Sequence, residues 1–174
     1  YTEGHYIFMA TANGTVKKTA LTDFSRQRSV GLRALELDEG DVLVGTAITD
    51  GSCDVMLFSS EGKTARFQEA DVRAMGRTAR GVRGIRLREG HRMISLVIPK
   101  PGGKVLTVSE NGYGKRTDTA EFPCKGRGNK GVIAMSTSRR NGKLVGAVQV
   151  FDGDELMLIS NQGTMVRTRT DEVP

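Results

Sequence analysis

The amino-acid sequence repeats about every fifty residues, and this repeat limits the possible folds more than any other feature of the chain. Each copy contains a turn with glycine in second place: Asn13-Gly14, Glu61-Gly62, Asn111-Gly112 and Gln162-Gly163. A small hydroxyl side chain stands three residues before each glycine, and a basic side chain stands four residues after it. Landmarks that recur in a fixed order at this spacing indicate a propeller, a solenoid or an array of small units.

The landmarks divide residues 1–174 into repeats of a single domain. We place the repeats at approximately 6–51, 54–102 and 104–153, with a partial repeat at 155–174. Short turns rich in Gly, Pro and Asp separate them, and no low-complexity linker interrupts the chain. Since the first residue is Tyr and no signal peptide precedes it, we expect the chain to be a piece of a longer protein.

Each repeat is expected to contain four β-strands. An apolar run such as Val55–Phe58 precedes the Xaa-Gly turn, and a run such as Thr15–Lys18 follows it. Such a turn between β-forming residues predicts a hairpin, most strongly where it is Asn-Gly. The third and fourth strands are expected after two later glycines, as in Val82–Leu87 and Met93–Ile98. We interpret residues 69–75 as a loop with one short helical turn, because glycines follow closely.

This pattern predicts an all-β, propeller-like fold of repeated four-stranded antiparallel blades, with about three and a half repeats present. A single small sheet cannot bury both of its faces, so each blade depends on its neighbours for packing. Three and a half repeats do not close an ordinary ring, and the end blades are expected to leave strand edges unpaired.

Composition points to an acidic partner. The net charge is +6, and nucleic acid is the first candidate for such a surplus, although a solubilising surface gives the same total. Aromatic residues make up only 5%, which leaves few platforms for stacking unpaired bases. No apolar run approaches the roughly 20 residues that span a bilayer, so we expect no membrane association.

No catalytic or metal site is expected in this chain. Residues 126–131 match the dinucleotide pattern G-x-G-x-x-G, but a predicted strand follows them where that motif requires a helix. Cys53 and Cys124 lack metal-ligand spacing and are expected to be reduced thiols of a cytosolic protein. His5 and His91 are isolated, and no nucleophile with a matching base stands out. We therefore expect no cofactor bound to this chain.

The basic residues recur at matching points of the repeat. They end the second strand of each copy and populate the loop that follows. The predicted DNA-binding residues are Lys17, Lys18, Arg26, Arg28, Arg66, Arg77, Arg80, Arg83, Lys115, Arg116, Lys125, Arg127, Lys130 and Arg167. If the repeats stack around an axis, these side chains form a cationic band that complements the phosphates of a duplex. Such a band holds or bends DNA but reads no sequence.

Three other interpretations stay open at this point. The loops can be solvated surface without a partner, or a protein-interaction propeller can present them to an acidic protein. An enzyme domain would require converging titratable groups in a cleft, and the sequence offers none.

The sequence resembles the C-terminal domain of the bacterial DNA gyrase A subunit over essentially its whole length. The segments that carry the resemblance are Phe8–Thr19, Val72–Gly76, Gly81–Leu87, Asn111–Thr117 and Asn141–Val150. The related domain of the topoisomerase IV A-type subunit fits less well. The diagnostic box of the family, Gln-Arg-Arg-Gly-Gly-Lys-Gly, is absent, and Lys125–Gly131 keeps only Arg127, Gly128, Lys130 and Gly131 of it.

The resemblance implies a β-pinwheel, a disc of usually six blades that exchange strands and wrap DNA around a basic rim. The first blade, with its box, is expected to lie upstream of this chain. The resemblance further implies a non-catalytic part of a bacterial, cytoplasmic, nucleoid-associated enzyme that introduces negative supercoils. The implied partners are double-stranded DNA, the rest of the gyrase A subunit and the gyrase B subunit in a heterotetramer, with ATP and Mg²⁺ used by that holoenzyme.

Overall fold

The computed structural model describes all residues from Tyr1 to Pro174. The chain forms β-strands joined by turns and short 3₁₀ segments, without an α-helix. The strands are β1 (Tyr6–Thr11), β2 (Thr15–Ala20), β3 (Leu43–Thr49), β4 (Asp54–Ser59), β5 (Lys63–Gln68), β6 (Val82–Arg83), β7 (Met93–Val97), β8 (Lys104–Ser109), β9 (Gly114–Asp118), β10 (Val132–Ile133), β11 (Leu144–Val150), β12 (Glu155–Ile159) and β13 (Met165–Arg169). The 3₁₀ segments are η1 (Leu21–Phe24), η2 (Glu69–Asp71), η3 (Thr119–Glu121) and η4 (Thr170–Glu172). The short helical turn expected within 69–75 is η2.

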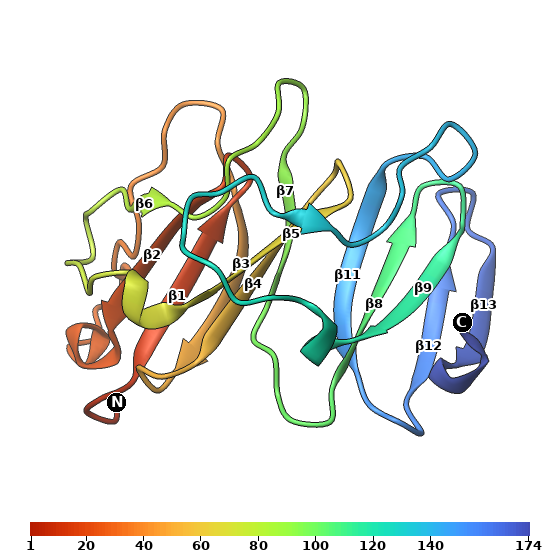
Figure 1. Ribbon diagram of the computed structural model, residues 1–174. Coiled ribbons are helices and arrows are strands. Elements are labelled where there is room, and N and C mark those ends of the chain that lie inside the picture. The colour runs from red at the N-terminus through yellow and green to blue at the C-terminus, as the bar shows by residue number, and fades with distance from the viewer.

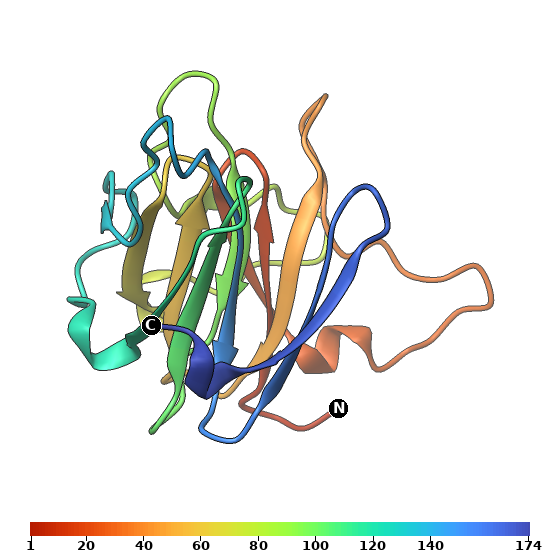
Figure 2. The same ribbon diagram turned by 90° about the vertical axis from the view of Figure 1, so that its right-hand side faces the viewer.

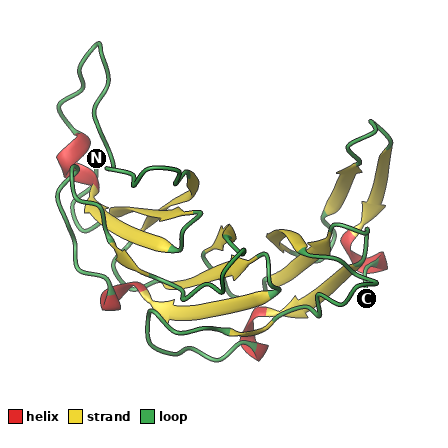
Figure 3. Cartoon of the chain, turned by 90° about the horizontal axis from the view of Figure 1, so that it is seen from above, coloured by secondary structure: helices red, strands yellow, loops and turns green.

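The strands form separate antiparallel sheets that stand side by side along an open crescent (Figures 1 and 3). The strand orders are β3-β1-β2-β6, β10-β5-β4-β7, β11-β8-β9 and β12-β13. The hairpin predicted around each Xaa-Gly turn lies at the centre of the first two sheets. The expected all-β, bladed architecture is therefore confirmed.

The third strand of a repeat belongs to the sheet of the preceding repeat. β6 pairs with β2, placing Val82 opposite Val16, and β10 pairs with β5, placing Val132 opposite Thr64. Neighbouring blades thus exchange strands, as the family resemblance implies. These strands are also shorter than the sequence predicted, because the chain leaves β6 at Gly84 to bond the turn of the preceding repeat.

The first repeat forms no third strand, which corrects the expectation of four strands in every repeat. Residues 31–40 contain turns but no strand, since no second strand of an earlier repeat is present to pair with them.

The glycine of each of the first two Xaa-Gly turns is also the docking point of the next repeat. The carbonyl oxygen of Gly14 accepts a hydrogen bond from the amide of Gly84 at 2.8 Å. The carbonyl oxygen of Gly62 accepts one from Ala134 at 2.8 Å. Gly62 has a φ of +86°, and a Cβ there would lie 2.2 Å from the Met135 carbonyl oxygen. Glycine is therefore required both by the turn and by the close approach of the next repeat.

The apolar run at β4 is buried on both faces. Val55 and Leu57 join one core cluster with the first sheet, and Met56 and Phe58 join a second cluster with the third sheet. Successive side chains of a strand point to opposite faces, so one strand serves both cores. Each such side chain contributes roughly 1.5–3 kcal/mol relative to exposure. Lateral packing between blades therefore supplies much of the stability.

The two edges of the sheets have different surroundings. β3, β7 and β11 lie next to one another along one edge, which we call the inner edge. Residues 72–81 and 122–131 lead from one sheet to the previous one along the opposite, outer edge; we call them the first and second crossing loops (Figure 1). The loop after η1 projects away from the sheets (Figure 2). These three loops position half of the predicted DNA-binding residues.

Candidate nucleic-acid interface

The basic residue four positions after each of the first three turn glycines joins neighbouring repeats. Lys18 Nζ donates to the carbonyl oxygen of Glu69 in η2 at 3.2 Å. Arg66 Nη1 donates to the carbonyl oxygen of Thr119 in η3 at 2.6 Å. Arg116 lies 3.4 Å from the Asp171 carboxylate in η4. The position that recurs most regularly in the sequence is thus used to connect one blade to the next.

Lys17 and Lys18 do not present charge at the surface, so their assignment to DNA binding is wrong. Lys17 is fully buried, and its ammonium donates to the carbonyl oxygens of Ala34 at 2.8 Å and Arg77 at 2.5 Å. Desolvation, and then the nearby Arg77 charge, lower the pKa of Lys17. Lys18 is buried against the ring of Tyr6, with Nζ 4.6 Å from its centroid. Both lysines act inside the fold, because carbonyl oxygens take up their donors.

Arg66, Arg116 and Arg167 are also engaged by protein groups. The Arg66 guanidinium pairs with Asp54 at 2.9 Å in addition to its bond to η3, and its side chain is only 18% exposed. Arg116 is equally shielded and lies 3.7 Å from Asp152. Arg167 is exposed and ion-paired with Glu155. A phosphate at these positions would have to compete with a carboxylate already in place.

Among the predicted residues, the cations that remain available lie in the crossing loops, in the loop after η1, and on β6 and β9. Of these residues, exposed side chains without a hydrogen bond or ion pair belong to Arg26, Arg28, Arg83, Lys115, Lys125 and Lys130. Arg127 is exposed and donates to the carbonyl oxygen of Arg83 at 2.8 Å. Arg77 is half-buried and bonds the carbonyl oxygen of Arg33 at 3.3 Å. Arg80 is exposed but pairs with Glu36 and Asp38.

The second crossing loop brings several of these cations together. Asn129 closes the loop, accepting from the Gly131 amide at 2.7 Å and donating to the Gly126 carbonyl at 2.6 Å. The Gly128 amide bonds the carbonyl oxygen of Gly84 at 2.9 Å, so the loop runs beside the segment that follows β6. Arg83, Lys125, Arg127 and Lys130 therefore share the outer edge, whereas Lys115 and Arg167 lie on more C-terminal strands.

The glycine-rich residues 126–131 do not form a dinucleotide-binding turn. They precede the two-residue strand β10 rather than a helix. Gly131 has a φ of +80°, and a Cβ there would lie 2.6 Å from the Thr64 carbonyl oxygen. Glycine is required at position 131 because the backbone passes so close to β5, and no helix end that could bind a phosphate follows.

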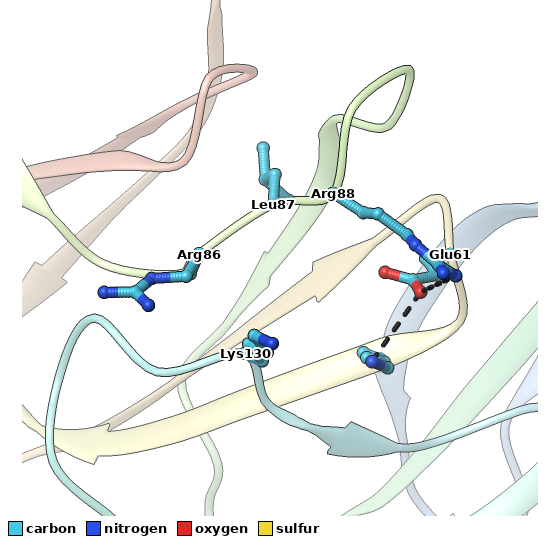
Figure 4. A pocket seen from close by; sticks show the side chains of 6 residues that line it. Glu61, Arg86, Leu87, Arg88 and Lys130 are labelled. Atoms are coloured by element: carbon cyan, nitrogen blue, oxygen red, sulfur yellow. Dashed lines mark hydrogen bonds and ion pairs between the residues drawn. The ribbon is translucent and has the colours of Figure 1, made fainter.

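A basic hollow of about 250 Å³ lies at the boundary between the second and third repeats (Figure 4). We call it the second cradle; its lining residues are Glu61, Lys63, Arg86, Leu87, Arg88 and Lys130. Glu61 is its single carboxylate and lies 3.6 Å from Lys63 and 3.3 Å from Arg88. The side chains of Arg86 and Lys130 have no protein partner and come from facing segments (Figure 4).

Sequence reasoning missed Lys63, Arg86 and Arg88. They stand outside the loops in which basic residues recur from copy to copy. Comparing the copies position by position could have found two of them, since Arg86 and Arg88 occupy the positions of Glu36 and Asp38 in the first repeat.

The outer edge offers exposed cations and backbone amides. No group of three or more His, Cys, Asp or Glu side chains is placed to hold a metal ion. Cys53 and Cys124 are free thiols, and burial raises the pKa of both. The structure contains no helix with the length and apolar content needed to span a bilayer. Exposed arginines and lysines of this kind can bind phosphate through charge-assisted hydrogen bonds.

Comparison with known proteins agrees with this architecture. The chain matches the family model described as the DNA gyrase C-terminal domain, a beta-propeller. The matched residues are 5–50, 54–100, 103–150 and 154–174. The DNA gyrase A subunit of Pseudomonas aeruginosa is 64% identical over 170 residues, covering 98% of this chain and 18% of that protein. The DNA gyrase A subunit of Escherichia coli is 55% identical over 173 residues, covering 99% of this chain and 20% of that protein. The chain thus spans about a fifth of the length of these curated relatives.

Two solved structures superpose closely on the chain. The DNA gyrase A C-terminal domain aligns with a TM-score of 0.85 and 29% identity, covering 98% of this chain and 57% of that chain. The C-terminal domain of DNA topoisomerase IV aligns with a TM-score of 0.91 and 25% identity, covering 98% of this chain and 54% of that chain. Sequence identity is higher to the gyrase domain, and backbone similarity is higher to the topoisomerase IV domain.

Proposed function

The chain belongs to the DNA gyrase C-terminal domain family, and from this we propose that it binds double-stranded DNA without reading its sequence. The duplex lies along the outer edge and is bent or wrapped there. The observation that carries this proposal is the set of exposed, unpaired cations on and beside the crossing loops.

The geometry favours contact with phosphates rather than bases. The chain has no helix that could enter a major groove, and its long loops are rich in Arg, Lys and Gly. Cations spaced along a curved edge can neutralise successive phosphates, because a duplex carries a charge about every 1.7 Å of its axis. Binding of this kind depends on shape and charge, and it lets a curved surface impose its curvature on DNA.

We further propose that the chain acts within a whole DNA gyrase as a non-catalytic module. In this proposal it works with the rest of the gyrase A subunit and with the gyrase B subunit in a heterotetramer. The enzyme would be a type II topoisomerase of the bacterial cytoplasm that acts on nucleoid DNA and introduces negative supercoils with ATP. A role in the topoisomerase IV A-type subunit is the alternative, favoured by the higher TM-score of that domain.

The residues of this chain do not fit the Mg²⁺ or ATP of such an enzyme. No cluster of carboxylates or histidines is placed for a metal ion, and the glycine-rich residues 126–131 lack the following helix that would hold a nucleotide phosphate. We therefore assign both groups to other parts of the enzyme.

A salt titration tests DNA binding directly. A labelled duplex of mixed sequence is titrated with the chain at several salt concentrations. We expect the logarithm of the association constant to fall by roughly 0.9 for each logarithmic unit of salt and each phosphate neutralised. Unrelated duplexes should bind equally well. An affinity that does not change with salt, or binding to an acidic protein in place of DNA, would contradict the proposal.

A topology assay tests bending or wrapping separately. Nicked circular DNA is ligated with the chain bound, and the linking number is measured after the protein is removed. A change in linking number that grows with protein concentration supports wrapping.

An Arg127→Glu, Lys130→Glu double variant should lower DNA affinity and leave the circular dichroism spectrum unchanged. Loss of folding in that variant would assign these residues a structural role instead.

A further inference from the structure

The two repeat boundaries of the outer edge contain the same cradle, built from equivalent positions. The pairings of Val82 with Val16 and of Val132 with Thr64 have the same register relative to the repeat. Applied to the residues around them, this equivalence places a first cradle where the first repeat meets the second. Its residues are Asn13, Thr15, Glu36, Leu37, Asp38 and Arg80, and all of them line one hollow, which Asp41 and Arg83 also border.

The charge of the two cradles is opposite at two equivalent positions. Glu36 of the first cradle corresponds to Arg86 of the second, and Asp38 corresponds to Arg88. The cation contributed by the crossing loop is present in both, as Arg80 in the first and Lys130 in the second. The backbone is therefore shared, and the side chains decide which ions each cradle accepts.

In the first cradle, the protein supplies its own anions. Arg80 Nη1 lies 2.9 Å from Asp38 Oδ1, and Arg80 Nη2 lies 3.3 Å from Glu36 Oε1. Two carboxylates thus stand beside the guanidinium where phosphate oxygens would have to lie. A phosphate approaching Arg80 meets two like charges and must displace both.

In the second cradle, cations outnumber the single carboxylate. Glu61 is shared by Lys63 and Arg88, which leaves Arg86 and Lys130 without a partner. The Arg86 amide bonds the carbonyl oxygen of Asn129 at 2.8 Å, which holds the segments of Arg86 and Lys130 side by side. Two unpaired cations on adjacent segments can both contact one phosphate group.

We propose that the second cradle seats a backbone phosphate of the bound duplex, while Glu36 and Asp38 close the first cradle to phosphate. This inference rests on the proposed DNA binding and adds that the repeat boundaries along the outer edge contribute unequally to DNA affinity. The second cradle holds the duplex at the boundary between the second and third repeats, and Arg80 at the preceding boundary adds little.

The experiment compares variants that change charge equally at different places. Lys130→Gln and Arg86→Gln each remove a cation of the second cradle, and Lys100→Gln removes an exposed, unpaired cation from the turn between β7 and β8. Glu36→Gln with Asp38→Asn frees Arg80, whereas Glu39→Gln with Asp23→Asn removes two exposed carboxylates that have no ion pair with Arg80. Duplex affinity is measured at several salt concentrations, and circular dichroism confirms folding.

We expect Lys130→Gln and Arg86→Gln each to weaken binding several-fold at about 0.1 M salt and to reduce the salt slope by up to about one. Lys100→Gln should have a smaller effect on both the duplex affinity and the salt slope. Freeing Arg80 should tighten binding and steepen the salt slope more than the Glu39 and Asp23 control does.

The outcomes separate this inference from the proposed function. If the chain binds DNA with a steep salt slope but the cradle variants behave like their controls, the unequal contribution of the two cradles is wrong and the proposed DNA binding stands. If the unmodified chain shows no salt-dependent binding, the proposed function itself fails. Should Arg86→Gln alter the fold, the Lys130→Gln and Glu36 with Asp38 variants still decide the question.

Discussion

Arg66 Nη1 lies 2.6 Å from the carbonyl oxygen of Thr119, so one guanidinium joins the second repeat to the third. The same side chain pairs with Asp54 of its own sheet at 2.9 Å. Arg66 belongs to a position that is basic in every copy, and its charge is used to connect two blades and is not left free to bind DNA. This separation of roles leads to the first prediction.

Arg66→Gln should lower the free energy of unfolding by about 2 kcal/mol, because Asp54 and the Thr119 carbonyl both lose a charged donor. Lys115→Gln is the matched control, since Lys115 is exposed and unpaired; it should change stability by no more than about 0.5 kcal/mol. Urea denaturation of both variants measures the difference. Equal stability of the two variants would contradict a connecting role for Arg66.

Gly62→Ala should be more destabilising than Gly112→Ala, although both glycines have positive φ and the same place in the repeat. A Cβ at Gly62 would lie 2.2 Å from the Met135 carbonyl oxygen, whereas nothing lies within 4 Å of a Cβ at Gly112. We expect a difference of at least about 2 kcal/mol in the free energy of unfolding. Faster hydrogen exchange at the Ala134 amide should accompany it, since that amide docks on Gly62. Similar losses in both variants would show that backbone strain alone is responsible.

Lys17 should make stability depend on pH in the alkaline range. Burial, and then the charge of Arg77, lower the pKa of Lys17 in the folded chain. The unfolded chain then binds the proton more readily, so unfolding takes up a proton between the two pKa values. The free energy of unfolding due to this group therefore rises with pH across that window.

The measurement is the difference in unfolding free energy between the unmodified chain and Lys17→Met, followed from neutral pH upward. We expect the difference to shift in favour of the unmodified chain as pH rises. The same comparison with Lys100→Met, at an exposed site, should show no such trend. A Lys17 difference that is constant or falls with pH would refute this interpretation.

Glu69→Thr should stabilise the chain by about 1 kcal/mol or more. Glu69 is fully buried, and neither carboxyl oxygen has a hydrogen-bond partner, which is unfavourable for a polar group. The equivalent residues Thr119 and Thr170 donate to the carbonyl oxygens of Gly103 at 3.2 Å and Phe151 at 3.3 Å. Thermal denaturation compares Glu69→Thr with Glu89→Thr, which removes an exposed charge. A lower melting temperature for Glu69→Thr would mean that the carboxylate has a stabilising role.

The repeat, the hairpins and the blade-like sheets could all be predicted, because each depends on neighbouring residues in the chain. The turn at Asn13-Gly14 follows from local conformation, and the strand at Val55–Phe58 follows from an apolar run whose side chains point alternately to opposite faces. The loops that hold Arg127 and Lys130 at the surface were also recognisable, because glycine and charge prevent strands there.

The partners of the charged residues could not be predicted. Lys18 and Arg66 were interpreted as surface cations, yet each bonds a carbonyl oxygen more than fifty positions away. Arg80 and Lys130 are basic residues at equivalent positions of the repeat, but another segment places two carboxylates beside Arg80 and none beside Lys130.

The amino-acid sequence by itself determined that this protein is a series of small antiparallel sheets with a surplus of positive charge in its loops. Periodicity and turn chemistry act over a few residues and need no knowledge of the whole molecule. Tertiary structure alone decided which blade receives each exchanged strand and which cations remain free for a phosphate. Those outcomes depend on distances between segments far apart in the chain, and the electrostatic interactions concerned fall off within several ångströms.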